Sequence, residues 1–151
     1  MDISEITDYL YVGAQPAPTD CADLGALNVG LVINMRAESK PHAAFSAPPL
    51  SVLWLRTFDI FLLPIRMRVL ERGVRAAAPV IARGQKVLVH CHMGRHRSVA
   101  MAAAILIARG VTARAAMAQL AERRASADPY LWYIRRQIEK FERYWRERNP
   151  A

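Results

Sequence analysis

The sequence predicts an α/β fold in a single domain spanning residues 1–151, with a central, mostly parallel sheet of four to five strands flanked by helices. Short apolar runs that suit buried strands alternate with longer stretches that carry apolar residues at helical spacing. The most informative stretch is 86–99, KVLVHCHMGRHRSV. Its run at 87–89 predicts a buried strand, and the run at 99–108 that follows Ser98 is long enough for a buried helix.

The other elements continue this alternation. Further strands are expected at 6–13, 30–35 and 51–58. Helices are expected through 24–27 with Thr19 or Asp20 as cap, at 62–83, at 113–124 with Thr112 as cap, and at the C-terminal end with Asp128 as cap and Pro129 at the first position. Pro79 should kink or end the helix at 62–83, because proline lacks the backbone N–H that a helix interior uses.

The loop between the runs at 87–89 and 99–108 has the features of an anion site. Backbone N–H groups at a helix start have no partner within the helix, and the helix dipole adds partial positive charge there. Cys91 lies at the strand end, where such donors and Arg97 would lower its pKa and make a nucleophilic thiolate. A buried cysteine is more often inert packing. The combination with Gly94, Arg97 and Ser98 favours the nucleophile, because Arg97 can also hold a tetrahedral oxyanion with two hydrogen bonds.

The motif His90-Cys91-x5-Arg97-Ser98 resembles the signature loop of the cysteine-dependent protein tyrosine phosphatases, and the short chain points to their dual-specificity branch. The resemblance implies a phosphatase fold with the Cys-x5-Arg loop between a central strand and a helix. It also implies a phosphocysteine intermediate on Cys91, phosphorylated proteins as substrates, and neither metal nor other cofactor. The residues expected to surround a bound phosphate or sulfate are His92, Met93, Gly94, Arg95, His96 and Arg97.

Asp59 is the candidate general acid. Between Glu38 and Cys91 the only carboxylates are Asp59 and Glu71, and Glu71 falls in a predicted helix where a solvated face is the default. Asp59 falls at a strand-to-loop junction 32 positions before Cys91, on the loop where the resemblance implies the acid. The alternative is that Asp59 caps the following helix.

Two supporting roles are expected. Ser98 is the candidate hydrogen-bond donor to the Cys91 sulfur during hydrolysis of the phosphocysteine, because its hydroxyl directly follows Arg97. For Glu38 we expect a scaffold ion pair with an arginine rather than a catalytic role.

The substrate class stays open at this stage. Basic residues in the loop resemble the phosphoinositide-cleaving branch, and Gly94-Arg95-His96-Arg97-Ser98 resembles the branch that cleaves inositol pyrophosphates. An asparagine common before the last helix in the family is missing. The first candidate function is a phosphatase of phosphoproteins, and the second is a phosphatase of inositol phosphates, their lipids or RNA 5′ phosphates. The third is a non-catalytic phosphate-binding module. Arg95, His92 and His96 either form a rim that attracts further phosphates, or Arg95 is solvated and His96 packs beneath the loop.

The composition limits partners and location. A formal net charge of +8 favours polyanionic partners, although codon bias in a bacterial genome would also produce so much arginine and alanine. In the last helix arginines alternate with glutamates, which indicates a solvated face, so no nucleic-acid partner is expected. We expect no membrane span, because the sequence has no apolar run of about 18 residues, and no export, because its start lacks a signal-peptide core. With two cysteines seventy positions apart, Cys21 being a half-buried helix residue rather than a resolving thiol, we expect a cytoplasmic monomer.

Overall fold

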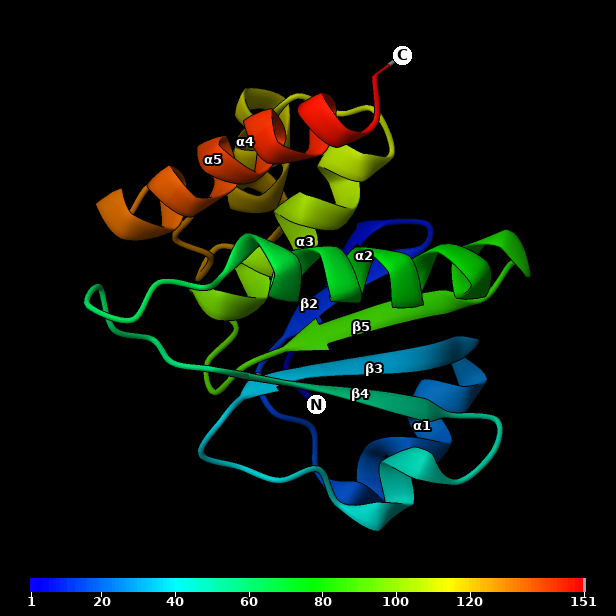
Figure 1. Ribbon diagram of the computed structural model, residues 1–151. Helices are drawn as coiled ribbons and strands as arrows, with labels where there is room; N and C mark the ends of the chain where they lie inside the picture. The colour runs from blue at the N-terminus through cyan, green and yellow to red at the C-terminus, as the bar shows by residue number, and fades with distance from the viewer. Residues whose placement is uncertain (151) are drawn as a thin grey trace.

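A computed structural model describes residues 1–150 of the chain (Figure 1). Its centre is a five-stranded sheet with the order β1-β2-β5-β3-β4, in which β1 alone runs antiparallel to its neighbour. The strands are β1 (Ile3–Thr7), β2 (Leu10–Gly13), β3 (Val29–Arg36), β4 (Ser51–Thr57) and β5 (Lys86–His90). The predicted α/β fold with a mostly parallel sheet is therefore confirmed.

Helices cover both faces of the sheet. The helices are α1 (Cys21–Ala26), α2 (Met67–Ala82), α3 (Arg97–Ala108), α4 (Ala113–Arg123) and α5 (Trp132–Arg148). Figure 1 shows α2 to α5 on one face, and α1 on the other together with the short 3-10 helices Pro18–Asp20 and Ala43–Ser46. No helix within residues 1–150 combines the length and the apolar character that a bilayer crossing requires.

The central strand β5 is buried on both faces. Val87 and Val89 belong to the large core that α2 to α5 close, whereas Leu88 belongs to the smaller core beneath α1. Because successive side chains of a strand point to opposite faces, a strand covered on both sides needs a continuous apolar run. The next element, α3, is buried along nearly its whole length, so the segment between them is fixed at both ends.

The boundaries of two predicted elements are wrong at the two ends of the chain, and those of a third are discussed below. The expected strand 6–13 is a hairpin, with β1 and β2 separated by a turn at Asp8 and Tyr9. The last helix begins at Trp132 with Leu131 as its N-cap, not after Asp128. By contrast, Thr112 caps α4 as predicted, since its hydroxyl oxygen accepts the N–H of Ala115 at 3.1 Å.

The largest error concerns the segment before α2. The helix expected at 62–83 begins only at Met67, and residues 62–66 belong to the loop that follows β4. Pro64 accounts for this, because a proline disfavours helical geometry in the residue before it and cannot donate a backbone hydrogen bond. Pro79 lies inside α2, which continues past it for one turn and ends at Ala82.

Candidate active site

Cys91 lies at the carboxyl end of β5, at the floor of a loop that ends where α3 begins at Arg97. Its Sγ lies 3.2 Å from the Ser98 hydroxyl. Burial by itself would raise the pKa of Cys91, but hydrogen bonds from the Ser98 hydroxyl and from the N–H groups of Ser98, Gly94 and His96 lower that pKa below its ordinary value. Donors converge on the sulfur as the sequence predicts, and they favour its thiolate.

Arg97 is oriented by the ends of β3 and β4. Its Nη1 donates to Glu38 at 2.8 Å and to the carbonyls of Thr57 at 2.9 Å and Met35 at 3.3 Å. The ion pair expected for Glu38 is therefore present, and the hydrogen bond from Arg97 lowers the pKa of Glu38. The buried Nε of Arg97 has no hydrogen-bond partner among residues 1–150, which leaves that donor for a ligand.

Asp59 is held by two side chains from distant elements. Its Oδ2 lies 2.8 Å from Nδ1 of His96, and its Oδ1 accepts the hydroxyl of Tyr133 at 2.7 Å. Burial and the bond to Asp59 raise the pKa of Tyr133 to about 12, so Tyr133 remains a donor at neutral pH. Asp59 does not cap α2, whose N-cap residue is Arg66, and the capping alternative is thereby excluded.

His96 lines the cleft, as the rim prediction requires, but its ring is held by two carboxylates. Its ring lies between Asp59 and the carboxylate of Asp128, which is 3.7 Å from Nε2. The side chain is mostly buried, and its two ring nitrogens contact the carboxylates of Asp59 and Asp128 rather than solvent. The structure thus joins the loop 91–97 directly to the loop that carries Asp59.

Arg124 is a buried residue that no sequence pattern distinguishes from the other arginines. At the end of α4 its side chain donates to the carbonyls of Gly94 at 2.9 Å and Met93 at 3.0 Å. It also forms an ion pair with Asp2 at 3.0 Å. Gly94 has φ 70°, and a Cβ there would lie 2.6 Å from both the Arg124 guanidinium and the backbone of Gly13, so this position requires glycine.

The candidate residues meet at one cleft with a volume of about 340 Å³. Its walls are formed by Arg36, Glu38, Asp59, Cys91, His92, Met93, Arg95, His96 and Arg97. Ser98 and Gly94 lie buried behind this wall and act on the cleft through their hydrogen bonds to the Cys91 sulfur. The cleft is at the small end of ligand pockets, which suits a phosphate and its immediate leaving group.

Arg36 is the cleft residue that sequence reasoning missed. It is the last residue of β3, it donates to Gln15, and its buried Nε has no hydrogen-bond partner among residues 1–150. Its position at the carboxyl end of a strand next to β5 was the available signal, since open α/β sheets bind ligands at that edge.

Below the cleft, His90 is neutral. Burial lowers the pKa of this histidine to about 4, and its Nδ1 lies 3.2 Å from the carbonyl oxygen of Cys91. A neutral ring supports the loop without adding a charge beneath the thiolate. Residues 1–150 contain no group of three or more His, Cys, Asp and Glu side chains placed to hold a metal ion.

The sequence of residues 10–143 matches the family model of the dual specificity phosphatase catalytic domain. The chain belongs to this family. It is therefore a phosphatase of the cysteine-dependent protein tyrosine phosphatase superfamily, as the signature loop indicates. A search of curated proteins returned no significant match.

Solved structures agree with the family assignment. PTPMT1 is 26% identical, with a TM-score of 0.86 and coverage of 97% of each chain. A structure of PTPMT1 in complex with PI(5)P is 25% identical over 97% of both chains, also with a TM-score of 0.86. Human DUSP28 is 24% identical over 95% of both chains, with a TM-score of 0.83, and shows the shared fold.

Proposed function

We propose that the chain hydrolyses phosphomonoesters through a phosphocysteine on Cys91. The Cys91 thiolate attacks phosphorus, the S–P bond forms, the P–O bond to the leaving group breaks, and Asp59 protonates the departing oxygen. The observation that carries this proposal is the shared cleft, in which Cys91 and Asp59 lie on the wall together with Arg97. The unpartnered Nε of Arg97 supports its assignment to the phosphoryl oxygens.

The second step returns the enzyme to its starting state. Water attacks phosphorus and gives a proton to the Asp59 carboxylate, while the S–P bond breaks and inorganic phosphate leaves. The Ser98 hydroxyl, 3.2 Å from Sγ, stabilises the thiolate that departs. Tyr133 and His96 position Asp59 for both proton transfers, because they hold its two carboxyl oxygens.

For the substrate we propose a phosphomonoester that carries further anionic groups, such as an inositol phosphate or a phosphoinositide headgroup. Basic side chains dominate the cleft, and its two carboxylates are already paired with His96 and Arg97. The basic residues that line the cleft are Arg36, Arg95, Arg97, His92 and His96, and the Nε of Arg36 lies 3.6 Å from Oε1 of Glu38. The similarity to PTPMT1, which has been solved with PI(5)P, points the same way. Phosphoproteins are the alternative, because a single phosphate satisfies Arg97 equally well.

A pair of cysteine variants tests the mechanism. Cys91→Ser should abolish turnover of a simple aryl phosphate and leave binding of a phosphate mimic largely intact, whereas the matched control Cys21→Ser should retain activity. Surviving activity in Cys91→Ser would end the covalent mechanism. Catalytic efficiencies on a panel of phosphopeptides, inositol phosphates and phosphoinositides then choose the substrate class, and a clear preference for phosphopeptides would overturn the substrate proposal.

A further inference from the structure

The exposed hydrophobic side chains of this chain gather beside the cleft. Within residues 1–150 ten large hydrophobic side chains are exposed, and all except Met1 and Leu27 belong to residues 58–63, Met93 or residues 130–132. We call the main group the apolar tip: Phe58, Ile60, Phe61, Leu62, Leu63 and Trp132. Single exposed hydrophobic residues are ordinary, but a contiguous group marks an interaction surface.

The apolar tip is held outward by the chain around it. Thr57 and Ile65, on either side of the exposed stretch, are buried, and the Leu63 N–H donates to the Ile60 carbonyl at 3.0 Å to close a turn. At the tip Leu62 is 72% exposed and Phe61 is 54% exposed. Figure 1 shows the β4–α2 loop projecting beyond the carboxyl edge of the sheet, below the amino end of α5.

Trp132 links the apolar tip to the catalytic residues. The rings of Phe61 and Trp132 lie 5.8 Å apart, and those of Trp132 and Tyr133 lie 5.6 Å apart. Tyr133 in turn donates to Asp59 in the cleft. Whatever covers the apolar tip is thus brought to the mouth of the active site.

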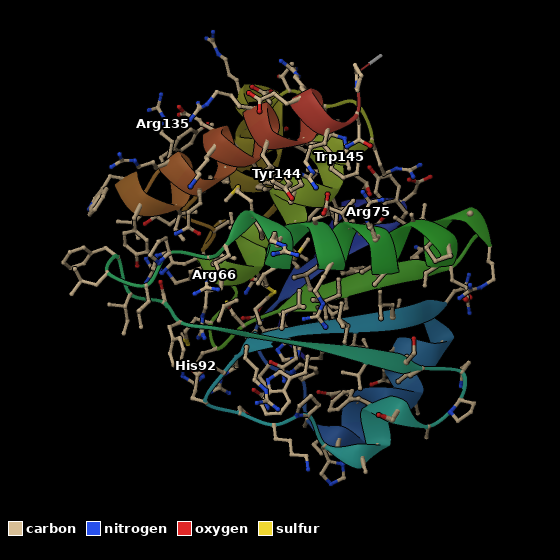
Figure 2. The ribbon with its side chains drawn as sticks, in the orientation of Figure 1. Arg66, Arg75, His92, Arg135, Tyr144 and Trp145 are labelled. Carbon is tan, nitrogen blue, oxygen red and sulfur yellow. The ribbon has the colours of Figure 1, made fainter. Side chains whose placement is uncertain are left out.

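The surroundings of the apolar tip are cationic. Two shallow clefts flank it, and their linings include the exposed side chains of Arg56, Arg66, Arg136 and Lys140, with no carboxylate among the described residues. Asp59 lies in the same loop, but its carboxylate is held by His96 and Tyr133. Figure 2 shows Arg66 and His92 on the side of the molecule from which this loop projects.

We propose that the apolar tip and these four cations dock the protein on the surface of an anionic membrane. Aromatic and aliphatic side chains enter the boundary between headgroups and acyl chains, and tryptophan is favoured there. Lysine and arginine side chains around them are attracted to anionic lipids. A protein partner would need carboxylates facing four cations, whereas an anionic bilayer provides both the apolar layer and the charge. Docking would present lipid-borne phosphomonoesters to Cys91, and that consequence rests on the proposed function.

Vesicle flotation tests the docking directly. The protein should float with phosphatidylcholine vesicles that contain phosphatidylglycerol, and much less with pure phosphatidylcholine. The double variant Phe61→Ser/Leu62→Ser should lose at least tenfold in affinity. The double variant Arg136→Gln/Lys140→Gln should lose roughly 25-fold, at about fivefold for each cation near the surface, and the wild-type affinity should fall as salt rises.

Matched controls separate docking from folding and chemistry. Leu27→Ser removes an exposed hydrophobic side chain elsewhere and Arg114→Gln an exposed cation on α4, so both should bind vesicles normally. The double variant Phe61→Ser/Leu62→Ser should keep wild-type turnover of a soluble aryl phosphate, which shows that it folds. Cys91→Ser should still float, so failure of the proposed chemistry would leave this result unaffected.

Fluorescence locates the contact. The fluorescence emission of Trp132 should shift to shorter wavelengths when anionic vesicles are added, and Trp132→Phe should remove most of that shift. Three results would overturn the proposal: no flotation of the wild type with anionic vesicles, an equal loss in Leu27→Ser, or a concentration-dependent dimer that Leu62→Ser abolishes and that does not bind vesicles.

Discussion

Replacing Arg124 tests whether the catalytic loop depends on a distant buried side chain. Arg124 is 3% exposed, lies 30 positions after Gly94 and donates to two carbonyls of the loop that surrounds Cys91. In Arg124→Met the apolar stem is retained and the donors are removed. Those carbonyls would then lack their partner, and the loop would no longer be tied to the end of α4.

The structure sets the size of the effect. Leaving the buried Gly94 carbonyl without a donor should cost about 1–3 kcal/mol. Loss of the ion pair with Asp2, whose side chain is 67% exposed, should add about 0–1 kcal/mol. The total of about 1–4 kcal/mol corresponds to a fall in Tm of roughly 3–12 °C, at about 3 °C for each kcal/mol in a chain of this size.

Urea unfolding measures the loss of stability, and steady-state kinetics measure the effect of a loosened loop on activity. Asp2→Asn is the matched control, because it removes the ion pair but leaves the bonds to the loop. It should cost less than about 1 kcal/mol. Arg124 lowers the pKa of Asp2, so in the wild type the contribution of the pair is present above the ordinary aspartate pKa and is lost as the pH falls through the lowered value. If Arg124→Met were no less stable than Asp2→Asn and equally active, the proposed dependence of the loop on its hydrogen bonds to Arg124 would be refuted.

Three further predictions concern the cleft itself. Asp59→Asn should lose about 10²–10⁴-fold on alkyl phosphates and less on activated aryl phosphates, with Glu71→Gln near wild type; equal losses on both substrate types would indicate a structural role. Ser98→Ala should give a burst in rapid-quench kinetics. It should also raise the pKa of Cys91, so that kcat/KM declines at a higher pH as the solution is acidified; normal turnover without a burst would exclude this role. Arg95→Ala should raise KM several-fold for an inositol polyphosphate and leave a small monophosphate nearly unchanged, with the difference fading in salt, whereas equal effects would favour phosphoproteins.

The core of the site could be predicted from sequence because it is local. Cys91, Gly94, Arg97 and Ser98 lie within eight consecutive positions, and a strand followed by a tight loop and a helix fixes their arrangement. Asp59 was identifiable since it lies at a strand end at the same edge of the sheet. Short-range geometry and the parallel sheet were sufficient for these residues.

The remaining features depend on tertiary packing. Tyr133 lies 74 positions from Asp59, and the packing of α5 against α3 and α2 brings the two together. Arg124 reads as one of many arginines until its burial is known. The helix start expected at Leu62 is wrong because the local composition is misleading there. The apolar residues from 62 onward suit a buried helix, but Pro64 disfavours helical geometry in the residue before it, and Leu62 and Leu63 are exposed.

Trapping the phosphoenzyme tests the central claim most directly. Ser98→Ala protein is mixed with an activated aryl phosphate, quenched in acid within the burst, digested and analysed by mass spectrometry. The peptide containing Cys91 should gain the mass of one phosphoryl group, in an amount that approaches one per active site and disappears in Cys91→Ser. Continued turnover with no adduct, or an adduct on another residue such as Cys21 or His96, would contradict it.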